Sequence, residues 1–227
     1  MSHDLIAFLN MLDVRCTGVI QVGANTGQEL SLFRKAGLDR GVLIEPLPAP
    51  FATLSNAVAH LPDFLPVQAL CTDKDDELCT FHVADNEDGL SSSVLAPGRH
   101  AEFYPGIRFE NTLQIRSVTL DTLMAKLTAE GLVRDPRDYD LLFMDTQGAE
   151  LMVLRGGMNV LNGTKAVWTE VSHGGLYQGD VRLPDLIAFF DQAGFDLYRL
   201  VVGRKTWGDA LFVRRSAARP TRGTAVG

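Results

Sequence analysis

The sequence predicts an α/β fold of the doubly wound type, in which a mostly parallel β-sheet carries helices on both faces. Short and almost wholly apolar runs, typical of strands buried on both sides, occur at residues 19–22, 42–44, 140–145 and 166–171. Segments with apolar residues three or four positions apart, which indicate helices, lie between these runs. Such alternation favours a parallel sheet, because a helix must return the chain between neighbouring parallel strands.

Each expected element has a signal of its own. Apolar residues at helical spacing predict helices over residues 5–12, 28–36, 50–60, 120–130, 151–158 and 186–193. Runs rich in apolar residues predict strands over residues 19–22, 42–44, 65–70, 78–83, 115–118, 140–145, 166–171, 197–202 and 210–213. The polar stretch 72–77 predicts a β-hairpin between the two strands that flank it. The last two strands are expected to form an antiparallel pair that closes the sheet.

Residues 85–110 have neither a helical nor a strand period and contain several glycines, prolines and serines. A loop of this length inside a compact domain is usually functional or mobile. We interpret it as a mobile lid or substrate loop over the site. A disordered excursion is the alternative.

Composition limits the class of protein. With 227 residues, of which 46% are hydrophobic and 22% charged, the chain is expected to form one domain over residues 1–213. The net charge of −7 argues against nucleic-acid binding, which normally requires a basic face. Residues 214–227 hold four arginines and no acidic residue, and this segment is expected to be a disordered basic tail.

Location and metal content follow from what the sequence lacks. No run approaches the roughly 18 apolar residues of a membrane span, and the start has no basic segment of the kind that opens a secretory signal. Cys16, Cys71 and Cys79 have no C-x-x-C spacing, which favours reduced thiols in a cytoplasmic protein without stable membrane insertion. The five histidines show no metal-ligand spacing, so no metal is expected.

The most informative motif follows the first predicted strand, where residues 19–27 read V-I-Q-V-G-A-N-T-G. Gly23 permits a sharp turn and a close ligand, and Asn25 is expected to cap the next helix. Free amides at that helix start would then attract an anionic group. Glu45 ends the second strand 22 residues after Gly23, about the separation at which an acid reaches ribose hydroxyls in nucleotide-binding folds.

The glycine spacing indicates which nucleotide binds. Dinucleotide sites carry G-x-G-x-x-G, whose second glycine admits a pyrophosphate, but Asn25 occupies that position here. A ligand with a ribose and no pyrophosphate, such as S-adenosylmethionine, fits the pattern better. An NAD-dependent oxidoreductase remains an alternative. A tight turn of an ordinary α/β protein would also explain the glycines alone.

Acidic residues also end later strands. Asp145 follows one apolar run, and Glu170 and His173 lie at the end of the next. Ligands of such sheets bind at the carboxyl ends of the strands, so these side chains are expected to meet the glycine turn and Glu45.

Residues 145–156, which read D-T-Q-G-A-E-L-M-V-L-R-G, resemble the signature of FkbM-type S-adenosylmethionine-dependent methyltransferases. Residues 19–27 resemble the first motif of that family, and the likeness extends over about residues 5–213. The resemblance implies a Rossmann-like class I methyltransferase fold. It also implies O-methylation of a small-molecule or glycan hydroxyl, such as that of a sugar or hydroxylated metabolite.

The resemblance and the strand-end argument together nominate site residues. Expected cofactor contacts are Gln21, Gly23, Asn25, Gly27, Glu45, Pro46, Leu70 and Asp145. Expected substrate contacts are Ser92, Ser93, Glu170 and His173. Asp145 and His173 are the candidate catalytic bases, and Mg²⁺ held by Asp145 is a further option.

Three positions depart from the family pattern. Gln21 stands where an acid often helps to hold the methionine amino group, Phe143 where a lysine is common, and Gln147 where a glutamate is common. These changes leave open a non-catalytic relative that serves as an interaction module.

Overall fold

A computed structural model describes residues 3–172, 174–202 and 206–218. Seven strands form its main sheet, in the spatial order β3 (Phe64–Val67), β2 (Arg40–Ile44), β1 (Gly18–Val22), β7 (Leu141–Met144), β8 (Ala166–Ser172), β10 (Trp207–Arg214) and β9 (Phe195–Val202). The first five strands in this order pair in parallel, and β10 is antiparallel to both of its neighbours. The predicted fold class and the antiparallel closing pair are therefore confirmed.

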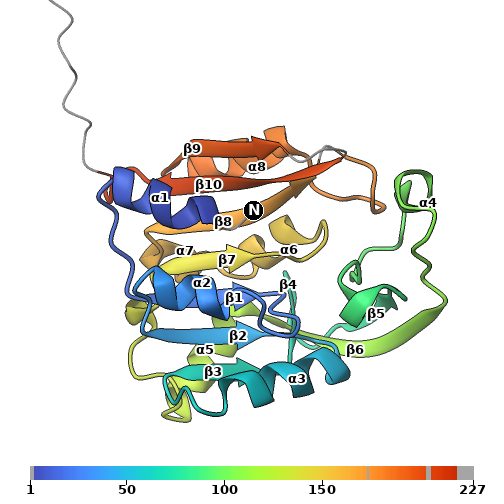
Figure 1. The fold of residues 1–227 in the computed structure, drawn as a ribbon, viewed down its shortest axis with the longest axis horizontal. Coiled ribbons are helices and arrows are strands. Elements are labelled where there is room, and N and C mark those ends of the chain that lie inside the picture. Colours follow the sequence, from blue (N-terminus) through green and yellow to red (C-terminus); the bar gives the residue numbers. More distant parts are fainter. Residues whose placement is uncertain (1–2, 173, 203–205, 219–227) are drawn as a thin grey trace, which may run out of the picture.

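Helices cover both faces of the sheet, as Figure 1 shows. One layer contains α1 (His3–Met11), α2 (Leu30–Lys35) and α3 (Pro48–Val58). The other contains α5 (Leu120–Ala129), α6 (Glu150–Arg155), α7 (Met158–Gly163) and α8 (Leu183–Gln192). The side chains of successive strand residues pack against opposite helix layers. Val19, for example, packs against the first layer and Ile20 against the second. Both faces are buried, which explains why the parallel strands are apolar runs.

A second, smaller sheet lies beyond the carboxyl ends of the parallel strands (Figure 1). It consists of β4 (Leu70–Thr72), β6 (Asn111–Thr119) and β5 (Leu78–Val83), with β6 in the middle. The predicted hairpin is therefore wrong, because β4 and β5 each pair with β6 instead of with each other. The polar turn between them binds β6, where Asp75 accepts a hydrogen bond from Thr119 N at 2.6 Å.

Two predicted elements are each divided in the structure. The strand predicted over residues 65–70 divides between the two sheets as β3 and β4. The helix predicted over residues 151–158 breaks into α6 and α7 at Gly156. A Cβ on Gly156 would lie 2.1 Å from the carbonyl oxygen of Thr72, so the chain comes too close to β4 for any other residue.

Residues 85–110 contain more structure than their sequence suggests. They include a short 3-10 helix (Glu87–Gly89) and α4 (His100–Phe103). Hydrogen bonds tie the segment to the body, from Ser93 Oγ to the Gln147 carbonyl at 2.9 Å and from Tyr177 Oη to the Ser91 carbonyl at 2.7 Å. The lid interpretation remains a prediction.

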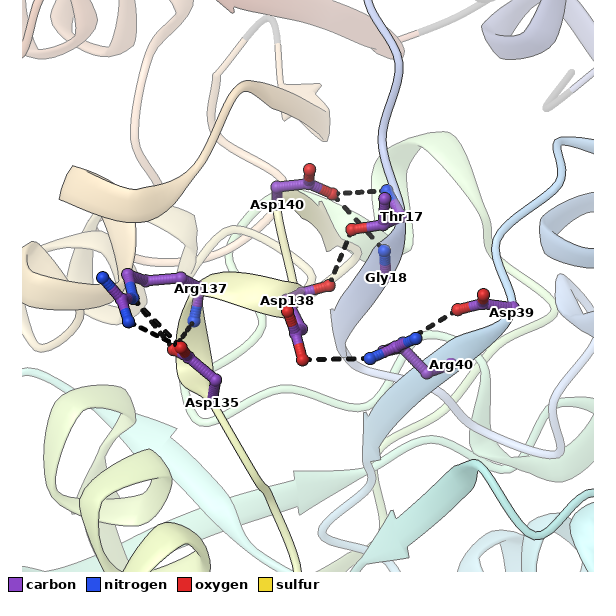
Figure 2. A network of polar contacts seen from close by, with 8 residues as sticks. All are labelled: Thr17, Gly18, Asp39, Arg40, Asp135, Arg137, Asp138 and Asp140. Atoms are coloured by element: carbon purple, nitrogen blue, oxygen red, sulfur yellow. Dashed lines mark hydrogen bonds and ion pairs between the residues drawn. The ribbon is translucent and has the colours of Figure 1, made fainter.

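A polar network joins β1 and β7 at their amino ends (Figure 2). The buried carboxylate of Asp140 accepts hydrogen bonds from the backbone amides of Thr17 at 2.7 Å and Gly18 at 3.3 Å. Nearby, Arg40 at the start of β2 forms an ion pair with Asp138 at 2.9 Å. These contacts align the amino ends of β1, β2 and β7. Their carboxyl ends are also in register, since Val22 lies opposite both Ile44 and Met144.

The sheet continues past the predicted domain boundary at residue 213. Strand β10 includes Arg214, whose guanidinium lies over the Phe195 ring. Arg215 forms ion pairs with Asp191 and Asp196. Residues 219–227 of the expected tail lie outside the described residues.

Candidate active site

A cavity of about 180 Å³ lies where β1, β2 and β7 end and the small sheet begins. Of the residues nominated from the sequence, its walls include Gly23, Asn25, Glu45, Pro46, Leu70, Ser92 and Asp145. Four other nominees, which are not among its lining residues, are Gln21, Gly27, Ser93 and Glu170. His173 lies outside the described residues. The residues that follow β1, β2 and β7 thus meet at one cavity, whereas Glu170 at the end of β8 lies outside its lining.

The turn after β1 brings the chain into contact with the end of β7. Gly23 has a φ of 83°, and a Cβ on it would lie 1.9 Å from the carbonyl oxygen of Asp145. Asp145 N in turn donates to the Val22 carbonyl at 3.0 Å. Only glycine allows this close approach.

The amides of this turn are not free to bind an anion, contrary to prediction. Gly23 N and Ala24 N donate to the Ile44 carbonyl, and Asn25 N donates to Glu45 Oε2 at 2.9 Å. Helix α2 starts only at Leu30 and has no side-chain cap, so the predicted Asn25 cap is also wrong. The positive φ of Asn25, 44°, turns the chain away from helix geometry at this point.

Glu45 is held in place by backbone amides. Its side chain is 4% exposed, and its oxygens accept from Asn25 N at 2.9 Å and Leu47 N at 2.8 Å. Burial raises the pKa of Glu45 to about 7, although these two hydrogen bonds lower it. A carboxylate has about four acceptor positions, so each oxygen can still accept a ligand hydroxyl.

Glu29 is a lining residue that the sequence analysis missed. It precedes α2, and its carboxylate accepts a hydrogen bond from Gln21 Nε2 at 2.9 Å. Burial raises the pKa of Glu29. The only sequence signal was an acid at the start of a helix, which is common for electrostatic reasons alone.

Asp145 belongs to a group of polar side chains at the end of β7 and β8. Gln147 Nε2 has two protons, and it lies 2.6 Å from Asp145 Oδ1 and 2.8 Å from Glu170 Oε2. The hydroxyl of Tyr177 lies 2.8 Å from Gln147 Oε1. The amide of Gln147 is therefore fixed on one side by a phenol and on the other by two carboxylates.

The two carboxylates do not hold their protons equally. Burial raises the pKa of both, and the negative charge of Asp145 raises the pKa of Glu170 well above its usual value. Hydrogen bonds from Glu170 and Gln147 lower the pKa of Asp145. The pKa of Glu170 is therefore raised further than that of Asp145, which makes Asp145, the member that lines the cavity, the more readily ionised of the two.

The loop after Asp145 is shaped by Glu150. This side chain is 1% exposed and accepts hydrogen bonds from Thr146 N, Thr146 Oγ1 and Gly148 N at 3.0–3.2 Å. Gln147, between these residues, has a φ of 55°. Helix α6 begins after this loop with Ala149 as its cap, so Asp145 is free of a capping role.

Comparison with known proteins identifies the family. A family model described as the Methyltransferase FkbM domain matches residues 21–197, most of the chain. The chain belongs to the FkbM methyltransferase family. The 2-O-methyltransferase NoeI of Sinorhizobium fredii is 28% identical over 186 residues, which cover 76% of this chain and 72% of NoeI.

A solved structure has a similar fold. The crystal structure of an FkbM methyltransferase from Methylobacillus flagellatus has a TM-score of 0.51 and 14% identity. The match covers 88% of this chain and 44% of that protein, so the chain spans less than half of its length. At this identity the likeness concerns the fold.

Two departures from the FkbM family pattern are neighbours in the structure. Gln21 of β1 pairs in register with Phe143 of β7. Phe143 is buried and packs edge-on against Phe33 of α2, with ring centroids 5.4 Å apart. An amide and an aromatic ring are thus side by side at the two positions where the resemblance implied an acid and a lysine.

Two further findings concern ions and membranes. Among the described residues, no group of three or more His, Cys, Asp and Glu side chains is arranged to hold a metal ion. None of the helices in the described part of this FkbM-family chain has the length and apolarity needed to cross a membrane.

We expect the thermal unfolding midpoint to fall as the pH rises from 5 to 8. Burial raises the pKa values of Glu45 and Glu150 from 4.5 to about 7, so the folded state binds protons more tightly than the unfolded state. Their stabilising contribution is complete below pH 4.5 and is lost as the pH rises to about 7. Burial lowers the pKa of His100, and this shift has the opposite effect, because it makes the folded state more stable as the pH rises.

Circular dichroism melts at constant ionic strength would measure this dependence. The variant Glu150→Gln should flatten it, because glutamine does not titrate. A midpoint that rises steadily up to pH 8 would contradict the prediction.

Proposed function

We propose that this chain binds S-adenosylmethionine in the cavity and transfers its methyl group to a hydroxyl oxygen of a sugar or hydroxylated metabolite. Family membership supports methyl transfer, and the similarity to a protein named as a 2-O-methyltransferase supports oxygen as the acceptor atom. The observation that carries the proposal is the charge of the cavity.

Three carboxylates line the cavity, those of Glu29, Glu45 and Asp145, and no Lys, Arg or His side chain is among the lining residues described. S-adenosylmethionine has a sulfonium and an ammonium group, and these positive charges attract the three acidic side chains and favour their ionised forms. The pyrophosphate of NAD would meet like charges here and no basic partner. The three acidic side chains therefore fit the positively charged S-adenosylmethionine better than NAD, and this disfavours the alternative of an NAD-dependent oxidoreductase.

The position of each cavity residue suggests which part of the cofactor it contacts. Glu45 follows β2 and keeps free acceptor capacity on both oxygens, which suits the two ribose hydroxyls. Pro46 and Leu70 give apolar surface beside it, and Gly23 permits close approach of the ligand to the backbone. Asn25 and Gly27 contribute to the turn, where Asn25 Nδ2 donates to the Asp88 carbonyl at 2.8 Å.

When bound, the cofactor would supply a methyl group activated by a positively charged sulfur. The sulfur is the leaving group and would keep the electron pair of the carbon–sulfur bond when the acceptor oxygen is methylated. Asp145 is the proposed base that takes the hydroxyl proton, since it lines the cavity and is the more readily ionised member of its pair. Gln147 fixes the orientation of that carboxylate, and Glu170 retains its own proton. His173 remains a second candidate base.

Acceptor contacts are proposed from the loop above the cavity. Ser92 lines it, and its oxygen accepts from Ala84 N at 2.9 Å, so its hydroxyl proton can be donated to an acceptor. Ser93 is fully buried and bonds Gln147 and Leu95, which favours a supporting role behind the site.

Calorimetry with three ligands tests the cofactor assignment. We expect S-adenosylmethionine and S-adenosylhomocysteine to bind and NAD not to bind. Binding of NAD without any response to S-adenosylmethionine would overturn the proposal. A chain that binds neither would support a non-catalytic module.

The variant Glu45→Gln should weaken cofactor binding by about 1–3 kcal/mol, the usual cost of losing hydrogen bonds to a charged acceptor. Glutamine keeps the size of the side chain but has a single oxygen for the two amides and the ribose. Thermal melts of the same samples would separate a lost ligand contact from a loosened turn. Unchanged affinity would show that Glu45 does not hold the ribose.

A further inference from the structure

Gln21 is a buried amide on an otherwise apolar face of the sheet. Its neighbours in register are Leu43 and Phe143, and all three side chains are buried. Its Nε2 donates to Glu29, while its Oε1 has no hydrogen-bond partner among the described residues. Leaving such an acceptor unpaired costs about 1–3 kcal/mol, so packing alone would favour an apolar residue here.

Glu29 is the group that this amide holds, and it shares the cavity with Asp145. Burial raises the pKa of Glu29, the Gln21 hydrogen bond lowers it, and the negative charge of Asp145 raises it again. Both carboxylates line the same cavity. A cation bound beside them would relieve their repulsion and gain attraction from both.

The order of the strands assigns different parts of a ligand to different acids. Glu45 follows β2, Gln21 lies on β1, and Asp145 follows β7, which is the spatial order of these strands in the sheet. Glu45 is also fixed by its own bonds to Asn25 and Leu47. A ligand whose ribose lies on Glu45 would therefore extend past Glu29 toward Asp145.

We infer that Glu29 binds the amino group of the methionine part of the cofactor, and that Gln21 is the positioning residue that fixes the Glu29 carboxylate. The inference rests on the proposed cofactor, S-adenosylmethionine. An ammonium group offers three donors. Among the described residues, Gln21 is the one other residue that donates a hydrogen bond to the Glu29 carboxylate. Glu45 already accepts from two backbone amides, and Asp145 already bonds Gln147 and Glu170. The acid absent at position 21 is thus supplied from position 29, at the start of α2.

The test compares two ligands that differ only in the amino group. S-adenosylhomocysteine carries it, and S-adenosyl-4-thiobutanoate lacks it while keeping the adenosine, the sulfur and the carboxylate. In calorimetry, Glu29→Gln should weaken S-adenosylhomocysteine binding about 10- to 100-fold, because a hydrogen bond to a charged group is lost. Binding of the deaminated analogue should be nearly unchanged. The control variant Glu45→Gln should weaken both ligands alike.

The variant Gln21→Leu tests the positioning role. It removes the hydrogen bond to Glu29 and places an apolar group between Leu43 and Phe143. We expect weaker binding of S-adenosylhomocysteine only, with a thermal midpoint that is unchanged or higher. A purely structural role would instead lower the midpoint and weaken both ligands.

The outcomes separate this inference from the proposed function. If the unmodified chain binds neither ligand, the proposed cofactor is wrong and the inference fails with it. If the unmodified chain prefers S-adenosylhomocysteine and Glu29→Gln keeps the same preference, the cofactor assignment stands and Glu29 is not the amino-group ligand.

Discussion

The variant Asp145→Asn should lose about 10²–10⁴-fold in turnover while its affinity for S-adenosylhomocysteine changes little, because removing a general base has effects of this size. Asparagine has nearly the same shape, and its oxygen can still accept the hydrogen bond from Gln147. It cannot take a proton from the acceptor hydroxyl. Single-turnover methyl transfer from labelled cofactor, with calorimetry on the same samples, measures both quantities.

Glu170→Gln is the matched control for this prediction. Glu170 is the member of the pair whose pKa is raised further, so a neutral amide of the same size should lower turnover much less than Asp145→Asn does. If Glu170→Gln is the more damaging change, the roles of the two carboxylates are reversed. If Asp145→Asn abolishes cofactor binding and turnover together, Asp145 contacts the cofactor and His173 becomes the leading candidate base.

The variant Gly23→Ala should lower the free energy of unfolding by more than about 3 kcal/mol, because backbone strain and a steric clash act together. Its φ of 83° is unfavourable for alanine, and the added methyl group would lie 1.9 Å from the backbone oxygen of Asp145. Relief of that clash requires the ends of β1 and β7 to move apart. Urea unfolding monitored by tryptophan fluorescence measures the change.

Gly37→Ala is an internal comparison for that experiment. Gly37 has a similar φ, 77°, but nothing lies within 4 Å of a Cβ placed on it. Its cost should be limited to the backbone strain of about 1–2 kcal/mol. Equal losses for the two variants would mean that the contact between Gly23 and Asp145 is not tight.

The sequence was informative where a short stretch decides both structure and chemistry. The apolar run before Gly23 predicted a buried strand of the main sheet. The acids after the strands predicted that a site lies at the carboxyl ends of those strands. These signals are local, since a parallel strand must be apolar throughout and a tight turn requires glycine. Family motifs at residues 19–27 and 145–156 then led to the family that the comparison confirmed.

What the sequence did not reveal depends on contacts between distant segments. The central place of β6 between β4 and β5 depends on pairings between residues 28 to 47 positions apart, and no local pattern records which strand inserts between two others. Tyr177 meets Gln147 across 30 residues for the same reason. Glu29 resembled an ordinary surface acid until the burial of Gln21 beside it was known.

The polar network at the amino ends of β1 and β7 bears on how inactive variants should be interpreted. Strand β1 spans from Gly18 in that network to Val22 in the cavity wall, which is four steps of about 3.3 Å each. A slip of one residue between the two strands would shift Gly23 past Asp145 and turn Gln21 to the opposite face of the sheet. A genetic screen for lost activity would therefore recover substitutions of Asp140 alongside those of Asp145, although Asp140 lies a strand's length from any bound ligand.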